Sequence, residues 1–324
     1  MTRQFGVLSV VVLCLASLSA QQKGQWAPGQ YGLNAGVIPV PGFTYMNLAM
    51  NYSAGQANDS HGNRLPNLTG TYSFWVDENV FMFVPNKKIL GGYFAPYVNV
   101  NIANGNLVAV LSLPSLKTTG GGAGLADTFV APVNFGWHFS RLDFNVGYAF
   151  TAPTGSYSAG ASNNVGSGYW GHDFISGSTF YITKDKGTSA NLFMVWEGHG
   201  QKTTAVGTKA TPGQAFTTEW GIGQILPLDK KTMSRLLQVG FVGYDQWQVS
   251  ANSGTIGQIQ ASSLPYYSAH ALGLQTNYIS MKTGLNFFFK YYDEISAKAH
   301  TKGRTIVFGG SWTLPIPKPK PPQH

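Results

Sequence analysis

The sequence predicts an all-β fold, an antiparallel transmembrane β-barrel of about 12 strands. Three observations lead to this prediction. Apolar residues alternate with polar or small ones over most of the chain, charged residues make up 10% of it, and its N-terminus has the pattern of an export signal. An average globular chain has about a quarter charged residues. With 43% hydrophobic and 14% aromatic residues, the composition also excludes a disordered chain.

Residues 1–20 have the three parts of a secretory signal peptide. Arg3 supplies a positive charge, Val7 to Leu15 form an apolar stretch, and small residues lead to Ala20. Cys14 follows large residues, which argues against a lipid anchor. Cleavage near Ala20 removes this cysteine, so we expect no disulfide in the mature chain. An N-terminal segment at 21–42, the transmembrane barrel at 43–314 and a tail rich in Pro and Lys at 315–324 follow.

Period-two alternation defines the candidate strands. Five stretches are clear and eight are weaker: 129–137, 141–150, 237–247, 285–291 and 306–314, then 46–52, 72–84, 92–102, 107–113, 174–182, 191–199, 216–226 and 271–278. A closed barrel in one chain takes an even number of strands, so we expect one candidate to be short or peripheral. Turn clusters are predicted at 104–106, 120–124, 154–168 and 203–213.

Two all-β architectures fit this alternation, a secreted β-protein with an apolar core and a membrane barrel with apolar residues facing lipid. The export signal favours the membrane barrel, and so does a polar face built of Gly, Asn, Gln, Ser and Thr. Aromatic residues lie near strand ends, where interfacial girdles occur. We therefore predict that Trp137, Trp170, Trp247 and Trp312 lie at the membrane interfaces.

Several motifs, kept in order between about residues 39 and 314, point to a known family. They are Lys88 to Tyr93, Gly124 to Asp127, Gly136 with Trp137, Pro153 to Tyr157, Asn164 to Trp170, Thr211 to Gly213, and Gly240 to Tyr244. In these motifs the chain resembles the outer-membrane family named for the meta-pathway of phenol degradation. The resemblance implies a barrel that passes hydrophobic or aromatic small molecules. Many such barrels end on an aromatic residue read by the barrel-assembly machinery; here Gly310 and Trp312 are expected to provide an internal version.

Motifs of cofactor, metal or catalytic chemistry give no support to an enzyme. Gly166 to Gly171 matches G-x-G-x-x-G, but no helical segment follows it, so we expect no nucleotide cofactor. The histidines are scattered without metal-ligand spacing, and each is expected at the surface or in a loop. A G-x-S-x-G elbow is missing from the sequence. An outer-membrane acyl hydrolase stays as a third hypothesis, because triad residues need not be close in sequence.

Charged and aromatic residues on the non-lipid face are the candidate functional residues. A charge facing lipid costs about 2–4 kcal/mol for Arg or Lys, so strand-borne charges should point inward. By this counting Arg141, Asp143, Glu197, His199, Glu219, Lys290, Tyr244 and Tyr292 face the lumen, with Phe193 and Phe288. The charges either form salt bridges that close the lumen or border a constriction through which a ligand passes.

The leading functional hypothesis is a passive channel or transporter for small hydrophobic or aromatic compounds in the outer membrane of a Gram-negative-type bacterium. The alternative is a structural or adhesive barrel with a closed lumen and long ordered outer loops, such as 154–172 or 251–268. Expected partners are the lipid bilayer, the barrel-assembly machinery and a small hydrophobic or aromatic solute. We expect no cofactor, no metal and no nucleic acid, since the positive charges do not form one stripe.

Overall fold

A computed structural model describes residues 24–112 and 115–317. The signal peptide predicted at 1–20 and the end of the predicted tail, 318–324, lie outside the described residues. In the described ranges, helical structure is found as one 3-10 turn, η2 (Ala261–Ser263). No helix in these ranges is long and apolar enough to cross a membrane.

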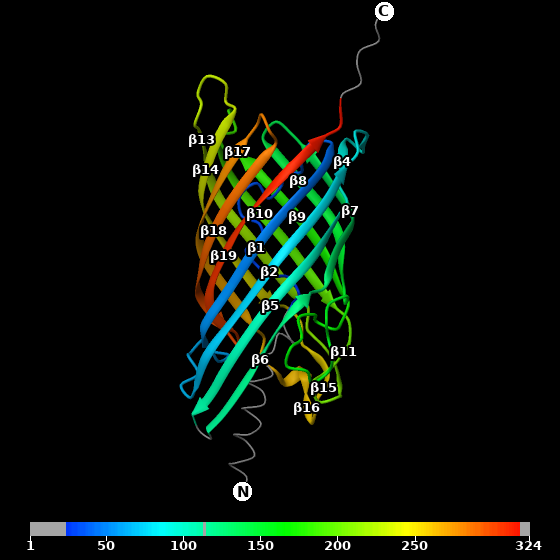
Figure 1. Ribbon diagram of the computed structural model, residues 1–324, viewed down its shortest axis with the longest axis vertical. Coiled ribbons are helices and arrows are strands. Elements are labelled where there is room, and N and C mark those ends of the chain that lie inside the picture. The colour runs from blue at the N-terminus through cyan, green and yellow to red at the C-terminus, as the bar shows by residue number, and fades with distance from the viewer. Residues whose placement is uncertain (1–23, 113–114, 318–324) are drawn as a thin grey trace, which may run out of the picture.

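Twelve antiparallel strands form the wall of a closed barrel (Figure 1). They are β1 (Gly42–Ala57), β2 (Leu68–Val84), β5 (Tyr97–Ser112), β7 (Thr128–His138), β8 (Leu142–Ala152), β9 (Gly171–Tyr181), β10 (Thr188–His199), β13 (Ala215–Pro227), β14 (Arg235–Gln248), β17 (Ser268–Ser280), β18 (Leu285–Lys298) and β19 (Thr301–Pro315). The last strand pairs with the first, from Gly42 opposite Pro315 to Ala57 opposite Thr301. The predicted fold class and strand number are confirmed.

The two ends of the barrel differ in their connections. At one end, which we call the turn end, β1 begins, β19 ends, and short turns at 139–141, 182–187 and 281–284 join strands. The other end, the loop end, carries the longer connections 58–67, 153–170, 200–214 and 249–267. The turn end is uppermost in Figure 1. In outer-membrane barrels the short turns are periplasmic and the longer loops are extracellular.

Smaller strands extend the wall at both ends. Near the turn end, β3 (Lys88–Ile89) pairs with β4 (Gly92–Phe94), which pairs with β7. At the loop end, β6 (Ser115–Leu125) forms a long hairpin with β5 that projects beyond the neighbouring strands. A separate four-stranded sheet also lies at the loop end and consists of β11 (Lys202–Thr203), β12 (Lys209–Thr211), β15 (Ser253–Ile256) and β16 (Ile259–Gln260).

Two predicted turns are wrong, because both lie within this hairpin. Residues 104–106 are inside β5, so the candidates 92–102 and 107–113 largely belong to one strand, and 120–124 are inside β6. Continuous pairing with β2 and β6 satisfies the backbone of β5 and overrides the turn preference of its Asn and Gly residues. The glycines of β6 allow close approach: a Cβ at Gly121 would lie 2.4 Å from the Gly105 carbonyl oxygen.

Alternating burial shows that the polar face of the wall is the inner one. Along β9, Asp173 and Thr179 are buried, whereas the residues that directly follow them, Phe174 and Phe180, are exposed on the outside. This pattern is that of a membrane barrel and not of a soluble sandwich.

One strand departs from simple alternation. In β7 the register shifts between Val130 and Val133, so Phe129 and Ala131 face inward while Val133 is exposed. The prediction that residues 129–137 present one apolar face is therefore wrong. Pro132 lies within this β-bulge, and it has no N–H for the ladder.

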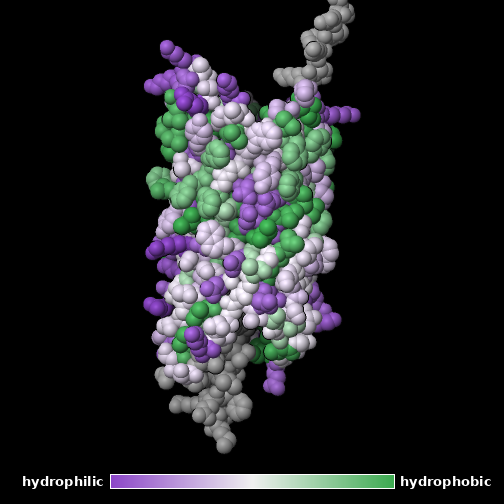
Figure 2. Space-filling view, in the orientation of Figure 1, coloured by the Kyte–Doolittle hydropathy of each residue, from purple (hydrophilic) through white to green (hydrophobic). Residues whose placement is uncertain are grey.

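The hydropathy of the outer surface shown in Figure 2 changes along the barrel axis. Hydrophobic side chains gather in the upper half of Figure 2, toward the turn end, and the lower part is mostly neutral or hydrophilic. Exposed apolar side chains near the turn end include Phe43 at the start of β1, Phe83 at the end of β2 and Leu314 at the end of β19. The distribution indicates that lipid contacts the turn-end half and that the loop end projects beyond it.

Candidate functional site

A cavity of about 1200 Å³ occupies the barrel interior. Its lining includes Tyr157 and Val206 from loop-end connections, and Met281 and Thr313 near the turn end. A single space is therefore bordered by residues from both ends of the barrel. This volume exceeds the usual range of pockets for small molecules, which is about 300–1,000 Å³.

One side of the cavity is largely apolar although it belongs to the inner face of a membrane barrel. Strands β1, β2 and β18 supply this lining through Leu48, Met50, Phe74, Val76, Val80 and Phe288. Among these side chains lie the polar Glu78 and Asn99, whose Nδ2 donates to Glu78 Oε2 at 2.8 Å. Such a lining, apolar with a few fixed polar groups, is typical of sites that accept small hydrophobic molecules.

The N-terminal segment 24–41 fills the other side of the lumen. It contacts strands from β7 to β18 before joining β1 at the turn end. Within it, Trp26 is buried and packs against Phe193 of β10 with ring centroids 5.4 Å apart. Tyr31 stacks on the same Phe193, with centroids 3.7 Å apart and rings 3° from parallel. The segment is thus part of the core of the barrel.

Two buried charges of the wall bind this segment near its middle. Glu219 of β13 accepts hydrogen bonds from Trp26 Nε1 at 2.9 Å and from the Tyr31 backbone N–H at 2.7 Å. Lys290 of β18 donates to the carbonyl oxygens of Gly29, Gln30 and Tyr31. Hydrogen bonds to charged groups contribute more than neutral ones, about 1.5–3 kcal/mol each.

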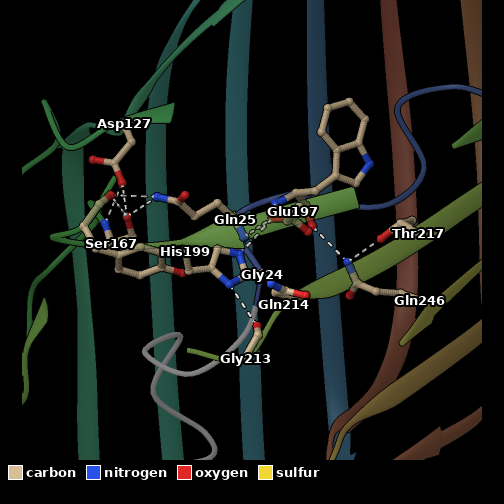
Figure 3. A network of polar contacts seen from close by, with 12 residues as sticks. Gly24, Gln25, Asp127, Ser167, Glu197, His199, Gly213, Gln214, Thr217 and Gln246 are labelled. Carbon is tan, nitrogen blue, oxygen red and sulfur yellow. Dashed lines mark hydrogen bonds and ion pairs between the residues drawn. The ribbon is translucent and has the colours of Figure 1, made fainter. Parts of the chain in front are cut away.

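A second network anchors the beginning of the segment, as Figure 3 shows. Glu197 Oε2 accepts from the backbone N–H groups of Gln25 at 2.6 Å and Trp26 at 2.9 Å, and lies 3.5 Å from His199 Nε2. His199 Nδ1 lies 2.9 Å from the carbonyl oxygen of Gly213. The Gln25 side chain reaches Ser167 in the loop 153–170. Wall and loop therefore hold the same end of the segment.

Amide side chains of the barrel wall and one close backbone contact hold the remainder of the N-terminal segment in place. Asn34 and Gln238 exchange side-chain hydrogen bonds of 2.8 and 3.0 Å, and Asn145 donates to the Ala35 carbonyl at 2.9 Å. At Gly36 a Cβ would lie 2.1 Å from the Asp143 carbonyl oxygen, so the backbones approach too closely for any side chain.

For Glu219 and Lys290, these contacts differ from the salt bridges predicted as one alternative for the lumen charges, whereas Glu197 and Asp143 each lie within 4.0 Å of a histidine. Among the described residues, no ion pair within 4.0 Å joins Glu219 or Lys290 to an opposite charge. Both instead hydrogen-bond to the segment, because an uncharged chain of backbone donors and acceptors lies between them. The lumen is narrowed by the segment itself.

Comparison with known proteins shows the family of this chain. Residues 54–308 match the profile of the family described as "Putative MetA-pathway of phenol degradation". The chain belongs to this family. The match covers most of the wall from β1 to β19, which confirms the resemblance found in the sequence motifs. No curated protein matches the chain.

Solved structures with the same architecture are outer-membrane barrels. An outer membrane channel from Pseudomonas putida F1 is 13% identical, with a TM-score of 0.68 over 90% of this chain and 100% of that one. The β domain of the Bordetella autotransporter BrkA is 9% identical, with a TM-score of 0.50 over 84% and 100%. At these identities the likeness concerns the fold. Together with the closed barrel, it places this family member in the outer membrane.

Most of the predicted lumen residues of this family member do line the interior. Asp143, Glu197, Glu219, Lys290, Tyr244 and Tyr292 are buried, as are Phe193 and the His199 side chain. The buried His199 side chain agrees with its predicted place on the lumen face and departs from the default expectation of a surface or loop position for each histidine. Asp143 Oδ1 lies 3.0 Å from His138 Nδ1 near the turn end. Tyr244 donates to Glu294 at 3.1 Å and Tyr292 donates to the Tyr31 carbonyl at 3.0 Å.

Arg141 does not face the lumen. It is exposed in the turn before β8, and its guanidinium donates to the carbonyl oxygens of Tyr181 and Ile182. The prediction began the strand one residue too early, because β8 starts at Leu142.

The four predicted interface tryptophans lie close to strand ends. Trp137 and Trp312 are near the turn end, while Trp170 and Trp247 are near the loop end. Trp170 and Trp312 are exposed, and the other two are half-buried. Their role at the membrane interfaces stays a prediction.

Sequence reasoning missed the part played by residues 24–41. Alternation is lacking there, so the strand pattern gave no signal. The segment contains no charged residue but has Trp26 and Tyr31 among its glycines and prolines. An exposed leader of that length would be expected to carry charge, so this composition was the available signal.

Proposed function

We propose that the protein is a passive channel for small hydrophobic compounds, aromatic ones included, across the outer membrane. The observation that carries this proposal is the cavity bordered from both ends of the barrel, with an apolar side formed by β1, β2 and β18. The family and the channel from Pseudomonas putida support it. A passive route needs no catalytic group, so we propose no enzymatic activity.

The lining of the cavity supports passage of hydrophobic solutes. Apolar lining residues such as Leu48, Val76 and Val80 replace water around the solute without requiring hydrogen bonds. Polar groups on the opposite side, including Glu219 and Lys290, are already hydrogen-bonded to the N-terminal segment. The space left for a solute is therefore the apolar part of the lumen.

Dye uptake into whole cells tests the proposal. Cells that express the protein should take up N-phenyl-1-naphthylamine, which fluoresces in apolar surroundings, faster than cells without it. Val80→Trp should reduce uptake because Val80 is 6% exposed and lines the cavity. Phe81→Trp is the matched control on the outer face of β2, where Phe81 is 39% exposed. Equal uptake by cells with and without the protein would refute the channel.

The second candidate function is a closed structural barrel. It is favoured by the extent to which segment 24–41 fills the lumen, and by the ordered loops 153–170 and 249–267 at the loop end. A closed barrel should give no uptake and no conductance in planar bilayers. Removal of the segment would then create activity that the complete protein lacks.

Hydrolase chemistry finds less support. In the described residues, Ser167 donates to Asp127 directly, and the His–Asp pairs His138–Asp143 and His270–Asp245 have no serine hydroxyl bonded to the imidazole. A triad instead needs the histidine between serine and carboxylate. Release of an acyl group from a p-nitrophenyl ester by the purified protein, lost in Ser167→Ala, would reverse this conclusion.

A further inference from the structure

An unusual lysine lies beside the cavity at its loop end. Lys202 of β11 is 3% exposed, and its Nζ has no hydrogen-bond partner in the described structure. The amine lies 5.4 Å from the ring centroid of Tyr169 and 5.7 Å from that of Tyr157. All three residues line the cavity. A buried ammonium group normally has both a counter-charge and hydrogen-bond acceptors, and the described residues supply no acceptor to Lys202.

The nearest carboxylate is already engaged. Asp127 accepts from the backbone N–H groups of Gly155 at 3.0 Å and Ser167 at 2.7 Å, and also from the Ser167 hydroxyl. No ion pair within 4.0 Å joins Asp127 to Lys202 in the described part of the chain. Asp127 therefore makes the region more favourable for a cation without occupying the donor positions of the amine.

The aromatic side chains around the amine are held in place. Tyr157 donates its hydroxyl proton to the Thr203 carbonyl oxygen next to Lys202. Its ring packs directly over Gly168, where a Cβ would lie 2.3 Å from a ring atom. Tyr169 is 2% exposed. A rigid pair of rings can keep a cation in position, but it cannot accept the three hydrogen bonds that an ammonium group donates.

We propose that Lys202 binds the carboxylate of an amphipathic monocarboxylate, aromatic or aliphatic, whose apolar body lies in the adjoining cavity. The carboxylate supplies the hydrogen-bond acceptors that the described residues do not offer the amine, and it adds a negative charge to that of the nearby Asp127. Val165, Val206 and Ile256 from three loop-end connections line the cavity and provide apolar contacts for the body of the ligand. This inference rests on the proposed channel function and narrows its substrates to those with an anionic head group.

Isothermal titration of the full-length protein in detergent tests the inference with paired probes. 4-Phenylbutyrate is compared with 4-phenylbutanol, and decanoate with decanol, so each acid has a neutral counterpart and the two arms separate aromatic from aliphatic ligands. We expect the acids to bind at least about tenfold more tightly than the alcohols. In Lys202→Met this preference should disappear, while the affinity for the alcohols stays unchanged.

Lys209→Met is the matched control. Lys209 lies opposite Thr203 in the same small sheet, and its side chain is exposed. It should keep the full preference for acids, which separates the Lys202 site from a general effect of positive charge at the loop end.

A second measurement uses the unsubstituted protein, so it does not depend on the folding of a variant. Acetic anhydride should modify Lys202, and the acids but not the alcohols should protect it, as read by mass spectrometry of peptides. Alcohols that bind as well as acids would overturn the inference and leave the channel standing. If neither class binds and dye uptake also fails, the channel itself is overturned.

Discussion

The protonation of one residue, Lys202, links the proposed binding of carboxylates to pH. Burial lowers the pKa of its amine from the ordinary value to about 7, an effect that the nearby Asp127 carboxylate partly offsets. The other titratable groups that face the amine are Tyr157 and Tyr169, whose pKa values are raised by burial, so both stay neutral near pH 7. The amine is therefore the group that changes charge near neutral pH.

The first prediction concerns the pH dependence of acid binding at this site. A carboxylate binds the protonated amine, so affinity should be constant between about pH 5.5, where the ligand is ionised, and about pH 7, and fall above pH 7 by at most about tenfold per pH unit. Binding near neutral pH should also take up a proton, measured by titration in buffers of different ionisation heat. Lys202→Met should show neither effect. A flat profile for the unsubstituted protein would contradict the assignment of Lys202.

Lys290 gives a second prediction at the residue scale. Its three hydrogen bonds to Gly29, Gln30 and Tyr31 should be lost in Lys290→Met, and loss of even about 1.5 kcal/mol raises the open population of the segment about tenfold. Maleimide labelling of an Ala27→Cys variant should then become about tenfold faster.

Lys298→Met supplies the control for this experiment. Lys298 ends the same strand, β18, and is exposed, so its removal should leave the labelling rate unchanged. Equal rates in the two variants would mean that Lys290 does not hold the segment.

At the scale of elements, the N-terminal segment combines tight anchoring with an absence of regular structure. Its backbone approaches the wall so closely at Gly36 that a side chain there would meet Asp143. Gly55 of β1 offers a contrast, since the nearest atom to its hypothetical Cβ is 3.9 Å away. Substitution of Gly36 should therefore displace the segment, whereas the same substitution at Gly55 measures only the general effect of adding a side chain.

The third prediction uses this contrast. Gly36→Val should push the segment off the wall and raise single-channel conductance in planar bilayers severalfold, whereas Gly55→Val should leave it unchanged. Deletion of 24–36 should give the largest increase, because the twelve-stranded wall is complete without these residues. Unchanged conductance in both cases would show that the segment does not limit passage.

The strands and the N-terminal segment also show what could and could not be predicted from the sequence. Alternation located all twelve wall strands because lipid on one side and polar lumen on the other impose two unlike faces. It failed at Pro132, where a β-bulge reverses the faces, and at 120–124, where glycines serve close strand pairing. Inward placement of Glu219 and Lys290 followed from the cost of charge in lipid. Their partners did not, since these lie about 190 and 260 positions away in an irregular segment.

The whole molecule depends on closure of the wall between β1 and β19. At this seam a Cβ on Gly309 would lie 2.1 Å from the Asn47 carbonyl oxygen, so only glycine allows the two strands to pair at this point. Gly105 in β5 tolerates a Cβ, with its nearest neighbour 3.8 Å away.

The fourth prediction is read on an unheated gel, where a closed barrel migrates differently from the boiled chain. Gly309→Ala should reduce the fraction of folded, heat-modifiable protein after refolding, and Gly105→Ala should not. If Gly309→Ala folds as fully as the parent, the seam accommodates the extra carbon by a backbone shift.

The position of segment 24–41 also constrains the order of assembly. Most of its hydrogen-bonding partners in the wall come from β8 to β18, so its binding surface is finished only after these strands have joined the sheet. Trp26 and Tyr31 are made early by the ribosome, but Glu219 follows them by 193 and 188 positions, and Lys290 lies still further along the chain. Contacts so distant in sequence form slowly. The part of the barrel interior that is synthesised first is therefore among the last to reach its native contacts.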